Sequence, residues 1–275
     1  MKQLLWLMGL IFSLCVQSAQ AKADLRLVAL SPHTVEMLAE LGLLDNIVGT
    51  VDYADYPEQA KSIPRVGGAY GLSIEKIVAL KPDTIVAWSA GNQASDLVRL
   101  KQLGLNVIDS SPKRLIDVAN DFRRIGQALG VSTKAEEIAQ AYERELLKIE
   151  QNYSHKKQLQ AFYQLWPEPM MTVNQETWSH QLLRACGVVN VFAQQPSQYP
   201  QISIENVVVK QPEVIIIPQE RGAPDAGKDL WLKWQQVPAV KNNNFVSADA
   251  DTLHRFTSRM LVGLAQLCAD LDQLR

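Results

Sequence analysis

The sequence predicts an α/β protein with two lobes of similar design, and three observations lead to this expectation. The first is an internal repeat at a distance of 130 residues: residues 72–88 and 202–218 both read as a serine-capped short helix, a proline and a β-branched apolar run. The second is the alternation of predicted strands and helices, which is typical of a parallel sheet. The third is a long helical pattern between the two copies. The period is far too long for a solenoid, so it indicates two lobes.

The first 21 residues read as a secretory signal. Lys2 supplies a positive start, residues 4–16 are apolar, and the Ala-Gln-Ala of residues 19–21 suits a cleavage site. The apolar run is short compared with the roughly 20 residues of a membrane span. We therefore expect an exported, soluble protein with no direct membrane insertion.

The charge balance excludes some classes of partner. The whole chain has 27 Lys and Arg against 29 Asp and Glu, and loss of the signal with Lys2 leaves a net charge near −3. This near-balance argues against nucleic acid or an anionic membrane surface as the main partner.

The cysteines predict one disulfide. Cys15 leaves with the signal, and Cys186 and Cys268 remain as an even pair in an oxidising compartment. Two buried free thiols are the alternative.

The first lobe is expected to cover residues 22–130. Apolar spacing predicts strands and helices in alternation, the strands at residues 25–30, 47–51, 84–88 and 106–108, and the helices at residues 32–41, 74–81, 94–103 and 115–129. Ser31 caps the first helix and Gly42 ends it. Residues 66–71 form a loop without the residue order of a phosphate-binding loop.

A long linking helix, residues 131–155, is expected next. Thr133 and Glu136 have the types and spacing of a capping box, and about 20 helical residues would span about 30 Å. The second lobe then covers residues 156–275. Its expected strands and helices are strands at residues 159–166, 214–218 and 245–246, and helices at residues 174–186, 204–210, 229–236 and 257–274.

No signature of an enzyme or a metal site is present. The nucleophile elbow, HExxH, Walker and Rossmann patterns are absent from the sequence. The four histidines show no ligand spacing with one another or with a cysteine, and we expect them at the surface or at helix ends; they are His33, His155, His180 and His254.

Aromatic residues follow several predicted strands, where an α/β sheet places its ligand. These residues are Tyr53, Tyr56, Tyr70, Trp88, Trp166 and Tyr199. Such rings would hold a flat, partly apolar ligand, although each ring alone could be a half-buried core or loop residue. Asp251 and Arg255, in the loop before the last helix, could bind polar groups of the ligand or form an exposed ion pair.

Glu75 and Glu205 occupy equivalent positions in the first turn of the two repeated helices. A carboxylate there stabilises the helix dipole by roughly 0.3–1 kcal/mol. The alternative is that the two carboxylates meet two cations on a symmetric partner.

Four segments resemble the periplasmic cobalamin-binding receptors of bacterial ABC importers: SIEKIVALKPDTIVAW, LSPHTVEMLAELG, DYADYPEQA and CGVVNVF. The first segment is also shared with receptors for haem and ferric siderophores, in the superfamily with a helical backbone. The resemblance covers essentially the whole mature chain. It implies a class III periplasmic binding protein, with two Rossmann-like lobes whose central sheets are flanked by helices, one long helix between the lobes, and cobalamin bound in the cleft.

The resemblance also implies roles for single residues. Glu75 and Glu205 would dock onto arginines of a dimeric permease that works with ATPase subunits, and Cys186 and Cys268 would form the family's disulfide. The implied ligand-binding residues are Tyr53, Trp88, Tyr199, Asp251 and Arg255, with Tyr70 and Trp166 as further assignments. Tyr199 stands where the family has tryptophan, Tyr70 is displaced by one position, and Trp166 falls in a poorly matching loop.

We therefore expect a monomeric solute receptor that is no enzyme and has no cofactor of its own. The alternatives are a haem or ferric-siderophore receptor of the same superfamily and a periplasmic α/β hydrolase. A haem receptor usually offers a Tyr or His to iron and a siderophore receptor often has a basic cleft, and this near-neutral chain with one candidate cleft arginine fits neither well.

Overall fold

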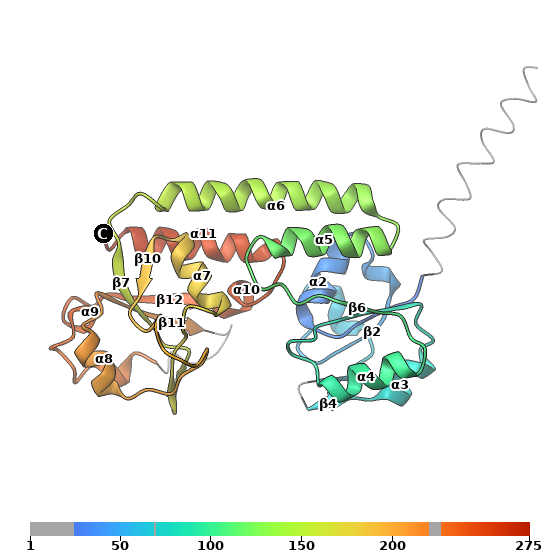
Figure 1. Cartoon of the computed structure of the whole chain (residues 1–275), viewed down its shortest axis with the longest axis horizontal. Coiled ribbons are helices and arrows are strands. Elements are labelled where there is room, and N and C mark those ends of the chain that lie inside the picture. Colours follow the sequence, from blue (N-terminus) through green and yellow to red (C-terminus); the bar gives the residue numbers. More distant parts are fainter. Residues whose placement is uncertain (1–24, 69, 220–226) are drawn as a thin grey trace, which may run out of the picture. The chain divides into compact units, whose positions relative to one another are not determined.

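The computed structural model describes residues 25–68, 70–219 and 227–275, so the predicted signal lies outside the described residues. The chain divides into two compact units between Ser111 and Pro112. Each unit contains one four-stranded sheet with helices around it (Figure 1). The predicted α/β class with two similar halves is therefore confirmed.

The first unit is built on the sheet β2-β1-β5-β6, in which every neighbouring pair is parallel. Its strands are β1 (Leu27–Ala29), β2 (Ile47–Thr50), β5 (Thr84–Ala87) and β6 (Val107–Asp109), with a small hairpin of β3 (Gly67–Gly68) and β4 (Gly71–Leu72). Its helices are α2 (Pro32–Glu40), α3 (Ile74–Ala79) and α4 (Ala94–Gln102), with 3₁₀ turns η1 (Leu44–Asn46) and η2 (Glu58–Ser62). All four strands thus end at the same edge of the sheet.

The elements of the first unit follow from its sequence pattern. Ser31 begins α2 as predicted, because its hydroxyl accepts the backbone N–H of Thr34 at 3.3 Å and Pro32 takes the first helical position. On one face of the sheet, alternate strand residues pack against apolar residues of α3 and α4. This cluster includes Val28, Leu30, Ile77, Ile85, Ala87, Leu97 and Leu100.

The second unit contains the sheet β10-β7-β11-β12, again entirely parallel. Its strands are β7 (Leu159–Tyr163), β10 (Val188–Asn190), β11 (Val214–Gln219) and β12 (Phe245–Asp249), with a hairpin of β8 (Trp166–Pro167) and β9 (Met170–Met171). Its helices are α5 (Asp117–Ala128), α6 (Ser132–Tyr153), α7 (Trp178–Ala185), α8 (Ile204–Lys210), α9 (Pro238–Lys241), α10 (Ala250–Leu253) and α11 (Arg259–Asp272), with one 3₁₀ turn, η3 (Asp229–Trp231).

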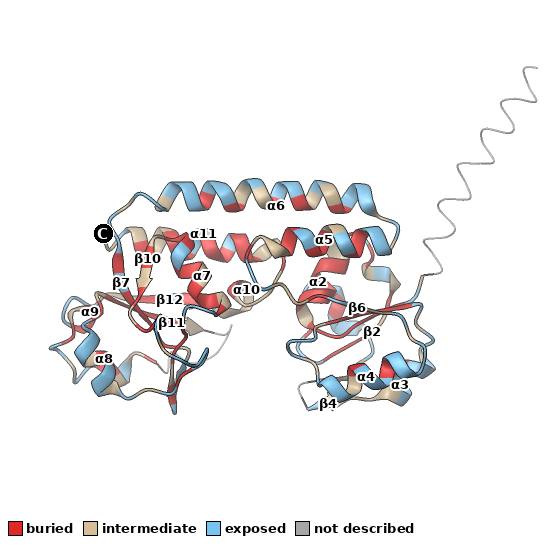
Figure 2. Ribbon diagram, viewed as in Figure 1, coloured by how far each residue is buried: buried red, intermediate tan, exposed pale blue. Residues whose placement is uncertain are grey.

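The long helix α6 packs along α5 and has buried residues on one side only (Figure 2). Arg123 of α5 pairs with Glu136 and Glu143 of α6 at 2.7 and 2.5 Å. The predicted capping box is wrong: α6 begins at Ser132 without a side-chain cap, and Glu136 serves this ion pair instead. Both helices belong to the second compact unit, whereas the sequence had placed α5 in the first lobe. The lobe boundaries near residues 130 and 155 stay a prediction.

The internal repeat extends to the hydrogen bonds of the two units. Before β5, Asp83 accepts the backbone N–H of Arg26 at 2.8 Å; before β11, Glu213 accepts that of Gln160 at 2.9 Å. Lys81 and Gln211, 130 positions apart, both have a left-handed backbone before a proline, with φ of 46° and 49°. The strand orders also correspond. The first strand of each four-stranded sheet lies between the second and third: β1 between β2 and β5, and β7 between β10 and β11.

Several boundaries in the second unit differ from the predictions. The strand predicted at residues 159–166 ends at Tyr163, and the helix predicted from residue 174 begins at Trp178, after the cap Thr177. The helix predicted at residues 229–236 is wrong, since only the turn η3 forms and its Trp231 is fully buried in the core. Strand β10, with the sequence Val-Val-Asn, was not predicted. These segments are short, and tertiary packing decides their conformation.

The predicted disulfide is confirmed. Cys186, at the end of α7, is bonded to Cys268 of α11, and their Cα atoms are 4.8 Å apart. Among the described residues, no helix has the length and apolar character needed to cross a membrane.

Candidate functional site

Each sheet has a point at which the strand order reverses. In the first unit this point lies between β1 and β5, and in the second between β7 and β11. Open α/β sheets bind ligands outside the carboxyl ends of their strands at such a point. Each unit therefore offers one expected position for a ligand.

Trp88 lies at this point in the first unit, directly after β5. Its backbone N–H donates to the side chain of Asn92 at 2.8 Å, and the Asn92 amide donates to Leu30 O, after β1, also at 2.8 Å. Asn92 thus ties the carboxyl ends of the two strands together. A Cβ atom at Gly91 would overlap the Trp88 ring, so the glycine backbone lies against that ring. The indole is held in place while remaining partly exposed.

His33 supports Trp88 and was missed as a site residue by the sequence reasoning. Its ring meets the indole edge to face, with centroids 5.6 Å apart. The buried imidazole is fixed through Nδ1 to Ser31 Oγ at 3.1 Å and through Nε2 to Ser110 O at 3.2 Å. The available signal was the Ser-Pro-His sequence directly after a strand. The histidines do lie at or near helix ends as predicted, but His33 and His180 are buried rather than at the surface.

Tyr53 and Tyr70 present exposed rings beside the carboxyl end of β2. Tyr53 is 80% exposed and has φ of 62°, a left-handed conformation that costs a non-glycine residue about 1 kcal/mol. Tyr70 is fully exposed in the β3–β4 hairpin. The hairpin is held beside β2, since Asp52 N–H donates to Gly67 O at 2.9 Å. The first unit thus brings Tyr53, Tyr70 and Trp88 to one edge of its sheet.

Trp166 lies in the two-stranded β8–β9 hairpin of the second unit, and Tyr199 lies in the bend just before a residue that bridges to this hairpin. Trp166 pairs with Met171 in the β8–β9 hairpin, and Met171 forms an antiparallel bridge with Gln201, two residues beyond Tyr199. Adjacent strands are about 4.8 Å apart, so Trp166 and Gln201 are about 10 Å apart. The rings are 56% and 49% exposed, and the Trp166 indole N–H donates to Glu168 O at 3.0 Å.

Asp251 and Arg255 belong to residues 250–256, which follow β12 and begin with helix α10; these residues are called the α10 segment below. The sequence predicted a loop, but Asp251 lies in a one-turn helix whose cap, Asp249, accepts the Asp251 N–H at 3.0 Å. Both residues are partly buried. The segment is joined to the end of β7, because Tyr163 Oη lies 2.9 Å from His254 Nε2. It therefore lies near the reversal point of its sheet.

Burial acts on both groups of this hydrogen bond. It raises the pKa of the Tyr163 phenol well above its usual range, while a hydrogen bond with Ser179 acts in the opposite direction. Burial also lowers the pKa of His254, and the charge of Asp251 offsets this only in part. His254 is therefore neutral at pH 7.

Glu75 and Glu205 are exposed at the second position of α3 and α8. Each helix is capped by a serine, Ser73 or Ser203, and a hydrogen bond from Ser203 lowers the pKa of Glu205. Each helix precedes a strand of a parallel sheet and runs in the direction opposite to that strand. The first turn of each helix, with its carboxylate, therefore lies toward the edge at which the strands end.

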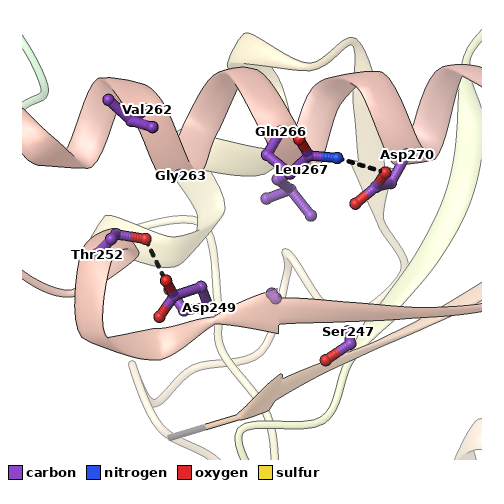
Figure 3. Close-up of a pocket in the computed structure, with 9 residues that line it drawn as sticks. Ser247, Asp249, Thr252, Val262, Gly263, Gln266, Leu267 and Asp270 are labelled. Carbon is purple, nitrogen blue, oxygen red and sulfur yellow. Dashed lines mark hydrogen bonds between the residues drawn. The ribbon is translucent and has the colours of Figure 1, made fainter. Parts of the chain in front are cut away.

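A pocket of about 240 Å³ lies between β12 and α11 (Figure 3). It is lined by Ser247, Ala248, Asp249, Thr252, Val262, Gly263, Gln266, Leu267 and Asp270. None of the predicted ligand-binding residues lines it. The same holds for a hollow of about 710 Å³ between α6, α7 and residues 114–116. Among the predicted residues, Tyr53, Tyr70, Trp166 and Tyr199 are exposed, while Trp88, Asp251 and Arg255 are partly buried.

Comparisons with known proteins find vitamin B12-binding proteins among the relatives of this chain. A vitamin B12-binding protein of Vibrio cholerae is 36% identical over 247 residues, 90% of this chain and 88% of that protein. One of Vibrio vulnificus is 34% identical over 272 residues, 97% of both chains. The crystal structure of the periplasmic vitamin B12 binding protein BtuF of Vibrio cholerae superposes with a TM-score of 0.81 at 36% identity, over 90% of this chain and 97% of that chain. The periplasmic haem-binding protein RhuT of Roseiflexus, at 22% identity and a TM-score of 0.80, shares the fold.

The family model described as periplasmic binding protein matches residues 27–252. This match spans both sheets, from β1 to α10. The chain therefore belongs to the periplasmic binding protein family.

Proposed function

We propose that this chain is a periplasmic receptor that binds cobalamin and delivers it to an ABC transporter of the inner membrane. The observation that carries the proposal is an identity of 32–36% with vitamin B12-binding proteins of Vibrio over 90–97% of the chain. Likenesses to haem-binding proteins stay at 18–22% identity and support only the fold. Cobalamin is thus the favoured ligand.

The chemistry of the two sheet edges suits this ligand. Cobalamin has a flat macrocycle with apolar faces and amide groups on its rim. The exposed or partly exposed rings of both units offer faces for the macrocycle and its base; they are Tyr53, Tyr70, Trp88, Trp166 and Tyr199. Arg255 donates hydrogen bonds to amide carbonyls, and Asp251 accepts them from amide N–H groups. No protein ligand to cobalt is part of the proposal.

The partner is a dimeric permease with its ATPase subunits, which supply the energy for transport. Glu75 and Glu205 meet one arginine cluster on each permease subunit, as their equivalent, exposed positions allow. The receptor acts as an exported monomer, without catalysis and without a cofactor of its own.

Calorimetric titration with cyanocobalamin tests the proposal. We expect a single site with a dissociation constant below the micromolar range, and cobalamin colour that stays with the protein after desalting. Haemin and a ferric hydroxamate siderophore serve as competitors and should not displace cobalamin. Absence of binding, or tighter binding of haemin, would overturn the assignment of cobalamin.

Trp88→Ala should weaken cobalamin binding about 10- to 30-fold, since a stacked ring and its buried area contribute about 1.5–2 kcal/mol. Trp88→Phe keeps a ring and should lose less. Gly91→Ala leaves the indole intact but displaces it, and should weaken binding as well. Thermal unfolding of each variant shows whether the fold is preserved. Unchanged affinity in all three would remove Trp88 from the site.

A further inference from the structure

We propose that Tyr163 and His254 are positioning residues, whose mutual hydrogen bond holds Asp251 and Arg255 in place for the ligand. Neither belongs to the residues proposed to touch cobalamin. The inference rests on the proposed function, in which Asp251 and Arg255 contact cobalamin. It adds the hydrogen bond that keeps these two residues in position.

Tyr163 links three elements at one buried point. It is the last residue of β7, and its side chain is completely buried. Its hydroxyl lies 2.9 Å from His254 Nε2, directly after α10, and also hydrogen-bonds to Ser179 near the start of α7. A fully buried hydroxyl carries a high cost when its hydrogen bond is lost. The end of the strand and the α10 segment are therefore held together.

The α10 segment is also held from its other sides. The Trp178 indole N–H donates to Leu253 O at 2.9 Å, and the same ring contacts Phe256 with centroids 4.6 Å apart. On the α11 side, Gly263 leaves room for Thr252, because a Cβ at Gly263 would overlap the Thr252 hydroxyl (Figure 3). Thr252 is bonded to the end of β12, since its hydroxyl donates to Asp249 O at 3.2 Å. The hydrogen bond with Tyr163 adds a connection to β7 at His254, directly before Arg255.

The hydrogen bond joins two uncharged groups. Tyr163 stays protonated and His254 is neutral, so Nε2 either accepts the phenol proton or donates to the phenol oxygen, according to the imidazole tautomer. The charged or titratable groups that act on His254 are Asp251 on its own segment and Tyr163 from β7, while Ser179 of α7 contributes a neutral hydroxyl to Tyr163. This arrangement keeps the imidazole uncharged beside the proposed ligand contacts.

Tyr163→Phe removes the hydroxyl and keeps the ring. We expect cobalamin affinity to fall about three- to tenfold, the range for the loss of one hydrogen bond. The matched control is Tyr142→Phe, another buried tyrosine of this unit, whose hydroxyl donates to Leu115 O at 2.7 Å. The control should lower the unfolding temperature but leave the affinity unchanged.

A double-mutant cycle separates positioning from general loosening of the fold. In an Asp251→Ala/Arg255→Ala background, Tyr163→Phe should cause little further loss of affinity, while its effect on unfolding temperature persists. His254→Gln keeps an acceptor and should retain most of the affinity, whereas His254→Leu should not. A loss of equal size in every background, or equal binding by the Gln and Leu variants, would overturn the inference.

The outcomes distinguish this inference from the proposed function. If the unmodified protein binds no cobalamin, both fail. If it binds and Arg255→Ala and Asp251→Ala both bind equally well, the α10 segment is no ligand contact and the positioning role falls with it. If these variants weaken binding but Tyr163→Phe does not, only the positioning role is wrong.

Discussion

Reversing the charge of both Glu75 and Glu205 should abolish cobalamin uptake by cells, while the purified protein binds cobalamin as before. Each carboxylate is exposed at the start of a short helix, so Glu→Arg leaves the packing of that helix unchanged. Against a permease arginine, however, the change replaces attraction by repulsion. Like charges placed together at an interface cost several kcal/mol, and the double variant has this cost at both positions.

The measurement is uptake of labelled cobalamin by cells that carry the double variant as their only receptor, with calorimetry on the purified protein. Glu58→Arg with Glu137→Arg is the matched control, because it also reverses one exposed glutamate in each unit. Each single variant at Glu75 or Glu205 should transport at a reduced rate. Normal uptake by the double variant would remove these residues from docking, and a loss of cobalamin affinity would mean that they lie at the ligand site.

The repeat explains why so much of the fold could be predicted from the sequence. Ser73 and Ser203 cap their helices, and the β-branched runs after Pro82 and Pro212 form buried strands, because these properties depend on residues close together in the chain. The same local pattern placed Trp88 at the end of its strand, and in the structure Trp88 directly follows β5. The equivalent hydrogen bonds of Asp83 and Glu213 to the first strand of each sheet show that the two repeats also share a tertiary contact.

The misses have a common physical cause. Trp231 was read as part of a helix, but its indole N–H donates to Gln164 at 2.6 Å and its ring fills the core, contacts that come from a residue 67 positions away. His33 and His254 likewise owe their roles to partners 77 and 91 positions distant. Such long-range partners cannot be read from local spacing. The residues assigned to the ligand site come from the resemblance to the family. Their contacts with a ligand stay predictions.

Removing the disulfide should have the largest effect on stability. Cys186 and Cys268 are 82 positions apart, and closing a loop of this length stabilises the folded chain by about 4 kcal/mol on the chain-entropy model. Both residues are completely buried, so alanine is the suitable replacement, since a serine hydroxyl there would add a polar group to the core. A domain has a net stability of about 5–15 kcal/mol, so the double variant should unfold at much lower urea concentration.

Two controls make the disulfide test specific. Reductant should lower the unfolding midpoint of the unmodified protein and leave that of Cys186→Ala/Cys268→Ala unchanged. Cobalamin affinity of the folded variant should be preserved, because the bond lies at the end of α7, about 12 Å along the helix from Trp178, which holds the α10 segment. A stability loss under about 1 kcal/mol would show that packing between α7 and α11 suffices without the bond. A loss of affinity would show instead that the bond sets the orientation of α7, and through Trp178 the position of the proposed ligand contacts.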